Sequence, residues 1–202
     1  MPVRFQLRKI AEADFPTRFG QFRIYGFEGD SGGEVEEAAV LQMGEITGDP
    51  PLVRIHSQCL TGDVFHSLRC DCRAQLELAL ESIAAEGRGL LVYELQEGRG
   101  IGLLNKLRAY ELQDQGADTV EANEQLGFEA DLRVYALPAA ILQFFGLSAV
   151  RLMSNNPDKI RALEQAGVRV AERVPCIVAA QESTEDYLRT KKERLGHLLD
   201  IA

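Results

Sequence analysis

The feature of this sequence that most restricts its fold is the alternation of apolar strands and amphipathic helices from residue 74 onward. Short apolar stretches with strand propensity occupy residues 90–95, 149–154 and 168–175. Apolar residues recur at helical spacing over residues 74–86, 103–116, 137–147 and 155–167. Strands that alternate with helices in this way predict a layered α/β core.

Two of the predicted helices carry more specific expectations. In the helix expected over residues 103–116, Leu104, Leu107 and Leu112 are predicted to form the inner apolar stripe, and Gly116 to end the helix. The charged segment at residues 183–199 has amphipathic spacing and predicts a helix in the tail of the chain.

The first part of the chain has a different pattern. Residues 19–27 and 37–46 alternate apolar and polar side chains, which predicts two half-buried strands, and residues 51–57 predict a third. With 202 residues, 46% of them hydrophobic, the chain suits one domain over residues 1–202. We expect a β-rich segment at about 1–58, followed by a three-layer α/β/α core with a mixed sheet at about 59–202.

The charge and the apolar pattern exclude several classes of partner. A formal net charge of −9 argues against nucleic acid or a polybasic membrane surface as the main interaction. No apolar run is long enough to span a membrane, and the first residues lack the apolar core of a secretory signal. We therefore expect a cytoplasmic protein whose thiols stay reduced.

The stretch "CLTGDVFHSLRCDC" holds three of the four cysteines, Cys59, Cys70 and Cys72. Three thiolates around Zn²⁺ leave a fourth position open for water, which is the arrangement of a catalytic site. The alternatives are a structural zinc completed by His56, His66 or another residue, and plain buried thiols. Cys176 follows a proline in a strand-like stretch, which favours a core thiol.

Two strand-to-helix junctions are candidates for phosphate binding. "QEGRGIG" at 96–102 contains Glu97 and Arg99, and "RLMSNNPDK" at 151–159 contains Ser154 and Lys159. Such loops bring backbone N–H groups and a helix N-terminus to an anion. For the first junction the pattern alone favours an ordinary tight turn, whereas for the second, helix capping and phosphate binding explain the residues equally well.

Asp131 and Arg133 stand two residues apart in "EADLRVY". On a strand the two side chains would share a face, whereas on a helix they would diverge. Taken alone, the pair is more typical of a surface ion pair than of a catalytic site.

The order of the motifs is informative beyond each motif. "RIHSQCLTGD", "SLRCDC", "QEGRGIGLLNKLRAYELQDQG", "DTVEAN", "LGFEADLR" and "RLMSNNPDK" follow one another along the chain. This series resembles GTP cyclohydrolase II, the zinc enzyme that opens riboflavin biosynthesis, and the resemblance covers nearly the whole chain.

The resemblance implies a role for each matching position. It implies one Zn²⁺ per chain held by Cys59, Cys70 and Cys72, with water as the fourth ligand. It implies Asp131 as proton acceptor, Arg133 as nucleophile, and Tyr110 beside the guanine. The implied GTP contacts are Arg54, Ile55, His56, Ser57, Gln58, Gln75, Glu97, Gly98, Arg99, Thr119, Ser154 and Lys159.

The implied reaction is hydrolysis of GTP at C8 of the imidazole ring, with release of formate and pyrophosphate. The product is 2,5-diamino-6-(5-phospho-ribosylamino)pyrimidin-4-one, and Mg²⁺ accompanies the GTP phosphates. A guanidinium is protonated below a pKa of about 12, so a phosphate clamp explains Arg133 as well as a nucleophile does. Members of the family are commonly homodimers.

The sequence departs from the family pattern at a few positions. Gln58 replaces a usual glutamate, Val134 a common aspartate, Arg73 a common glycine, and Ser154 a frequent threonine. The metal ligands and the Asp131/Arg133 pair remain. The alternatives are a paralogue that stops after ring opening and a nucleotide sensor; a zinc nucleobase deaminase is excluded because its H-x-E and P-C-x-x-C motifs are missing.

Overall fold

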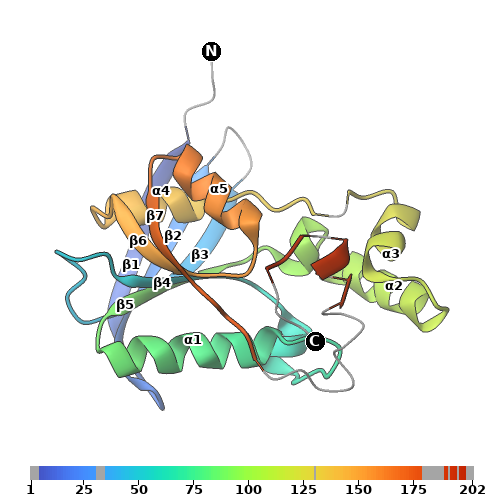
Figure 1. Cartoon of the computed structure of the whole chain (residues 1–202), viewed down its shortest axis with the longest axis horizontal. Helices are drawn as coiled ribbons and strands as arrows, with labels where there is room; N and C mark the ends of the chain where they lie inside the picture. The colour runs from blue at the N-terminus through green and yellow to red at the C-terminus, as the bar shows by residue number, and fades with distance from the viewer. Residues whose placement is uncertain are drawn as a thin grey trace.

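A single sheet runs through the computed structural model of the chain, which describes residues 5–30, 35–129, 131–178, 189–190, 192–194 and 196–198 (Figure 1). The sheet has seven strands in the order β1-β2-β3-β5-β4-β6-β7. Their bounds are β1 (Gln6–Thr17), β2 (Gly20–Asp30), β3 (Val35–Met43), β4 (Leu52–Ser57), β5 (Gly89–Glu94), β6 (Ala149–Met153) and β7 (Arg169–Val174).

The sheet is mixed, as predicted. β1, β2, β3 and β5 pair antiparallel, whereas β5, β4, β6 and β7 pair parallel. The helices are α1 (Cys72–Glu86), α2 (Leu103–Asp114), α3 (Thr119–Gln125), α4 (Ala136–Phe144) and α5 (Pro157–Gln165). Two short turns, the π-helical η1 (Leu60–Val64) and the 3₁₀ turn η2 (Glu97–Gly100), follow β4 and β5.

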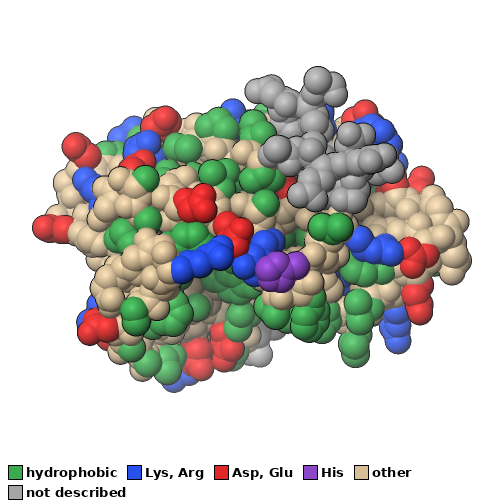
Figure 2. Space-filling view, turned by 90° about the horizontal axis from the view of Figure 1, so that it is seen from below, with side chains coloured by type: hydrophobic (Ala, Val, Ile, Leu, Met, Phe, Trp, Pro, Cys, Tyr) green, Lys and Arg blue, Asp and Glu red, His purple; other side chains and the backbone are tan. Residues whose placement is uncertain are grey.

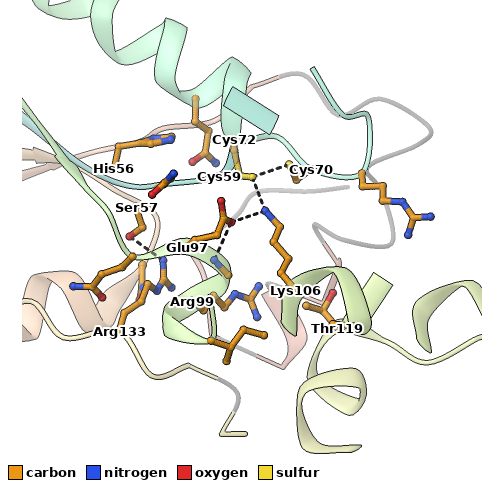
Figure 3. A pocket seen from close by; sticks show the side chains of 18 of the residues that line it. His56, Ser57, Cys59, Cys70, Cys72, Glu97, Arg99, Lys106, Thr119 and Arg133 are labelled. Carbon is orange, nitrogen blue, oxygen red and sulfur yellow. Dashed lines mark hydrogen bonds and ion pairs between the residues drawn. The ribbon is translucent and has the colours of Figure 1, made fainter. Parts of the chain in front are cut away.

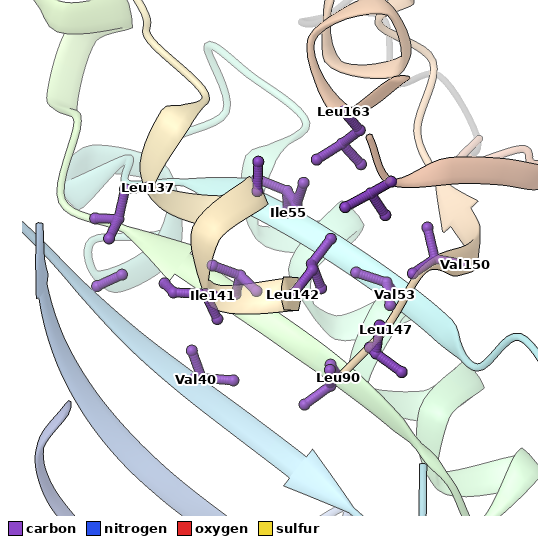
Figure 4. Packing of buried hydrophobic residues seen from close by; sticks show 14 of the residues in the cluster. Val40, Val53, Ile55, Leu90, Leu137, Ile141, Leu142, Leu147, Val150 and Leu163 are labelled. Atoms are coloured by element: carbon purple, nitrogen blue, oxygen red, sulfur yellow. The ribbon is translucent and has the colours of Figure 1, made fainter. Parts of the chain in front are cut away.

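Helices cover both faces of the sheet, which confirms the three-layer prediction (Figure 1). On one face Leu137, Ile141 and Leu142 of α4 and Leu163 of α5 pack on strand residues such as Val53 (Figure 4). On the other face α1 contributes its buried residues Ala79, Leu80 and Ile83 to a second core cluster. Cys176 is fully buried in that second cluster, so its prediction as a core thiol is confirmed.

Two elements were not predicted from the sequence. β1 pairs with β2 along its whole length, yet nearly all its residues are exposed, so it carries no apolar alternation. α3 begins with a capping box in which the Asp118 carboxylate accepts hydrogen bonds from the N–H groups of Val120 and Glu121. Its seven residues are too few to show a helical period.

The predicted inner stripe of α2 is wrong at Leu104 and Leu107, whereas Leu112 is half-buried. Leu104 is 73% exposed and Leu107 is 42% exposed. The inward face instead carries Lys106, Ala109, Tyr110 and Gln113, which line a pocket. Their spacing is helical, so the periodicity is present, but its face is adapted to a polar cavity and not to an apolar core.

The tail and the surface complete the description. The helix predicted over residues 183–199 lies largely outside the described residues. Within this range, residues 189–190 and 192–193 are described as helical. Among the helices that the structure describes, none combines the length and apolarity needed to cross a bilayer. On the face that carries α1, hydrophobic side chains lie in separate groups between charged ones (Figure 2).

Candidate active site

A pocket lies where the parallel strands end, the position at which α/β sheets bind ligands. β4, β5 and β6 end at Ser57, Glu94 and Met153, and the segments that follow them supply most of its wall. α2 closes the pocket from the side (Figure 3). Chain segments far apart in sequence therefore meet at one edge of the sheet.

Most of the residues proposed from the sequence line this pocket. They are Arg54, His56, Ser57, Gln58, Cys59, Cys70, Cys72, Gln75, Glu97, Gly98, Arg99, Tyr110, Thr119, Arg133, Ser154 and Lys159. Two are not among its lining residues. The Ile55 side chain is buried in the core, and Asp131 reaches the pocket only through its pairing with Arg133.

The three cysteines of the motif converge on one point (Figure 3). Their Sγ atoms all lie within 4.8 Å of one another, and those of Cys59 and Cys70 are 3.7 Å apart. Gly62 makes the convergence possible, because an added Cβ would stand 2.9 Å from the Cys70 Sγ and 3.1 Å from the Cys59 Sγ. Across the described residues, no His, Asp or Glu joins this group as a fourth donor.

The thiols influence each other's ionisation. Hydrogen bonds from Cys70 and Cys72 lower the pKa of Cys59 far below its usual value, and Lys106 adds to this effect. The contact with Cys59 and burial raise the pKa of Cys70 to about 11, although the contact with Cys72 opposes this rise. Contacts with Cys59 and Cys70, together with burial, raise the pKa of Cys72 well above its usual range. Cys59 is thus the first of the three to become a thiolate.

Lys106 links α2 to the cysteine cluster (Figure 3). Its Nζ lies 3.1 Å from the Cys59 Sγ and 2.7 Å from Oε1 of Glu97, and the Lys106–Glu97 pair is mostly buried. Burial lowers the Lys106 pKa, but Glu97 and Cys59 raise it by a larger amount, so the net shift of the pKa is upward. The other Glu97 oxygen accepts the Leu60 N–H at 2.7 Å, which ties η2 to η1.

On the opposite side of the pocket, Lys159 and Arg133 meet at the hydroxyl of Ser57. The Lys159 Nζ donates to the Ile55 carbonyl at 2.8 Å and approaches the Ser57 Oγ at 3.4 Å. The Arg133 Nη1 lies 3.5 Å from the same oxygen, which itself donates to Glu94 at 3.2 Å. Glu94, fully buried, was missed by the sequence interpretation.

The Asp131/Arg133 pair is not an open-surface ion pair. The two side chains are 24% and 12% exposed, and Arg133 contacts both carboxylate oxygens, with Nε donating to Oδ1 at 2.9 Å. Burial raises the Asp131 pKa, but Arg133 lowers it more, so Asp131 is held ionised. Burial lowers the Arg133 pKa, yet Asp131 overcomes this, so the guanidinium stays protonated.

The loop "QEGRGIG" adopts an unusual backbone at the pocket wall. Gly98 and Arg99 both have positive φ, 64° and 61°. For a residue with a Cβ this left-handed conformation costs roughly 1–2 kcal/mol. The buried Arg99 Nη1 finds no hydrogen-bond partner within the described part of the chain. A strained arginine with an unpaired nitrogen at the pocket is arranged for an anion.

Tyr110 and Arg54 complete the pocket from different elements. The Tyr110 hydroxyl lies 3.1 Å from the Thr61 Oγ1, and burial raises its pKa. The buried Arg54 guanidinium donates to the Met153 carbonyl at 3.0 Å and to Oε1 of Gln75 at 2.8 Å. Ser154 is buried at the start of the loop after β6.

Comparison with known proteins agrees with this site. The sequence profile of GTP cyclohydrolase II matches residues 8–175. This chain belongs to the GTP cyclohydrolase II family. A GTP cyclohydrolase-2 of Yersinia pestis is 54% identical over 195 residues, covering 96% of this chain and 98% of the relative. A GTP cyclohydrolase-2 of Escherichia coli (strain K12 / DH10B) is 55% identical over 196 residues, covering 96% and 99%.

Among solved structures, a two-domain 3,4-dihydroxy-2-butanone 4-phosphate synthase from A. baumannii aligns with 87% of this chain and 40% of its own. The TM-score is 0.47 and the sequence identity is 18%.

Proposed function

We propose that this chain is a zinc-dependent GTP cyclohydrolase II that catalyses the first step of riboflavin biosynthesis. It hydrolyses GTP to formate, pyrophosphate and 2,5-diamino-6-(5-phospho-ribosylamino)pyrimidin-4-one. The observation that carries the proposal is the joint presence, in one pocket, of a three-thiol cluster and a group of cationic side chains at the other wall. Membership of the family supports GTP as the substrate.

Cys59, Cys70 and Cys72 are the residues that would hold the zinc ion. Three converging sulfur donors with no fourth donor from the described His, Asp or Glu residues suit Zn²⁺ with one position left for water. Bound there, zinc lowers the pKa of water to roughly 7 and supplies hydroxide at neutral pH.

The cations at the other wall are proposed to bind the GTP phosphates, together with Mg²⁺. Lys159, Arg99 and Arg133 line the pocket. The Arg99 Nη1 has no hydrogen-bond partner among the described residues, which suits a cation that a phosphate would pair with. Arg133 stays protonated beside Asp131, and a protonated guanidinium has no lone pair for attack. We therefore assign Arg133 to clamping the phosphate and Asp131 to orienting it.

Tyr110 is proposed to act beside the guanine. Burial raises its pKa, so it keeps its proton at neutral pH and can donate it to a departing ring nitrogen. Thr119, Gln58 and Gln75, which also line the pocket, remain proposed contacts to the nucleotide.

We also propose a homodimer that works in the cytoplasm. A reducing compartment suits the four free cysteines. The exposed apolar side chains of Val64, Phe65 and Leu68 offer surface for a subunit contact. Light scattering after size exclusion should give twice the mass of one chain, whereas the mass of a single chain would exclude the dimer.

The decisive test is product analysis. The protein is incubated with GTP, Zn²⁺ and Mg²⁺, and formate and pyrophosphate are measured separately. We expect both products, loss of formate in Cys59→Ser, and retained formate in Cys176→Ala, whose thiol is buried in the core and is not one of the three converging thiols. Pyrophosphate without formate would mean that the ring is not opened. Tight GTP binding with neither product would support a nucleotide sensor instead.

A further inference from the structure

Behind the cysteine cluster lies a buried polar group formed by His56, Asp63 and Tyr93. The side chains of His56 and Asp63 are only 2% and 3% exposed. His56 on β4 and Tyr93 on β5 are register partners, and their rings stack with centroids 5.4 Å apart. Asp63 approaches them from η1, the turn that follows Cys59.

The Asp63 carboxylate collects hydrogen bonds from three directions. Its Oδ2 accepts the Cys59 backbone N–H at 3.0 Å and the Tyr93 hydroxyl at 2.7 Å. His56 Nε2 lies 3.2 Å from Oδ1 and 3.1 Å from Oδ2. Burying a carboxylate is unfavourable unless its oxygens are satisfied, and these donors satisfy both.

Asp63 and Cys59 are also joined through their backbones. The Asp63 N–H donates to the Cys59 carbonyl at 2.7 Å, so each residue donates an N–H to the other. The Asp63 carbonyl accepts from Nη1 of Arg73 at 2.7 Å. The backbone on which the Cys59 thiol stands is therefore fixed from the strands and from α1.

The protonation of His56 follows from its surroundings. Burial lowers its pKa, more than Asp63 raises it, so the ring is neutral at neutral pH. A neutral ring facing a carboxylate with Nε2 must carry its proton on that nitrogen. Nε2 is then committed to Asp63, and the ring acts as a donor to the carboxylate and not as a fourth metal ligand.

We propose that Asp63, held by His56 and Tyr93, is a positioning residue that presets Cys59 for metal binding. The three Sγ atoms must lie within 4.8 Å of one another. Cys59 precedes η1 in the sequence, whereas Cys70 and Cys72 follow it. Fixing its peptide before the metal arrives removes ordering that metal binding would otherwise require. The inference rests on the proposed zinc site and assigns His56 to the metal loop, where the sequence had suggested a GTP contact.

The experiment measures metal affinity in the full chain. Zn²⁺ binding is determined by competition with a chromogenic chelator, and Co²⁺ absorption reports the coordination geometry. Asp63→Asn keeps the shape of the side chain but replaces one acceptor oxygen by an NH₂ group that must face a donor. We expect Zn²⁺ affinity to fall about 10–100-fold and the Co²⁺ bands to change.

Tyr93→Phe removes a single donor and keeps the ring, so we expect a smaller loss, of about threefold or more. The matched control is Tyr25→Phe. Tyr25 lies on β2, far from η1 in the sequence, and belongs to the core cluster on the other face of the sheet. Its hydroxyl donates a hydrogen bond to Gln42 at 3.0 Å. The Zn²⁺ affinity of this variant should equal that of the unaltered chain. A shared loss in both Tyr variants would point to general destabilisation and overturn the inference.

The outcomes separate this inference from the proposed function. Zinc affinity within twofold of the unaltered chain and unchanged Co²⁺ bands in both Asp63→Asn and Tyr93→Phe would refute the positioning role alone. If Asp63→Asn does not fold, the Zn²⁺ affinity of Tyr93→Phe, compared with that of Tyr25→Phe, tests the positioning role. An unaltered chain that binds no zinc would overturn both the inference and the zinc site.

Discussion

GTP affinity should weaken as the pH rises through 7, because of Lys159. The Lys159 side chain is 4% exposed and has Glu94, Arg133, Arg54 and Asp131 around it. Burial lowers its pKa to about 7, with Arg133 and Arg54 in the same direction and Glu94 opposing them. A phosphate requires the charged form, so binding above the pKa must include uptake of a proton.

The size of the effect follows from that pKa. The charged fraction of Lys159 falls from about 90% at pH 6 to about 10% at pH 8, so affinity should fall about tenfold, or about 1.4 kcal/mol. Fold stability has the opposite dependence. An unfolded lysine has a pKa near 10.4, so between about pH 7 and 10 the unfolded chain binds more protons and stability rises with pH.

The assay is calorimetric titration of the zinc-loaded protein with GTP between pH 6 and 8. The γ-phosphate of GTP also titrates, so the same series is run on Lys159→Met, and the difference between the two belongs to Lys159. Equal pH dependence in both proteins would refute the reasoning. Glu94→Gln removes the charge that opposes the shift, so its affinity should begin to fall at a lower pH than in the unaltered chain.

Other substitutions test particular contacts. Gly62→Ala places a Cβ 2.9 Å from the Cys70 Sγ and should reduce bound zinc at least tenfold by elemental analysis while the fold persists. Lys106→Met leaves the Glu97 carboxylate buried without its cationic partner and should lower the free energy of unfolding, measured in urea, by about 3 kcal/mol. The loss should be smaller when Glu97→Gln is added. Leu104→Gln should change the free energy of unfolding by less than about 0.5 kcal/mol, since Leu104 is 73% exposed. A larger loss would show that the Leu104 side chain is buried in the core.

The fold class was predictable because the spacing of apolar residues along the sequence indicates which segments form strands and which form helices. Residues 90–95 and 149–154 became β5 and β6 almost as expected. β1 was not predictable because its pairing with β2 leaves its side chains exposed on both faces. Apolar residues recur periodically where one face of an element is buried. A strand with few buried side chains therefore shows no such pattern in its sequence.

The site was predictable to a different degree. The thiol cluster and most of the proposed contacts lie in one pocket, since their motifs follow strand ends or enter the helix beside it. Glu94 and Asp63 were missed because single acidic residues carry no spacing signal. The face of α2 was misassigned because Leu104 and Leu107 have the same period as Lys106 and Tyr110, and only the tertiary structure shows which side faces inward.

The position of β5 between β3 and β4 has a consequence for synthesis of the chain. β3 and β4 follow each other in sequence, yet they become parts of one sheet only when β5 lies between them. On the ribosome, the three-stranded N-terminal meander therefore waits with the β3 edge open, and open strand edges invite association with other chains. Nascent-chain release experiments should find aggregation greatest for lengths that end before Glu94 and much less for lengths that include β5.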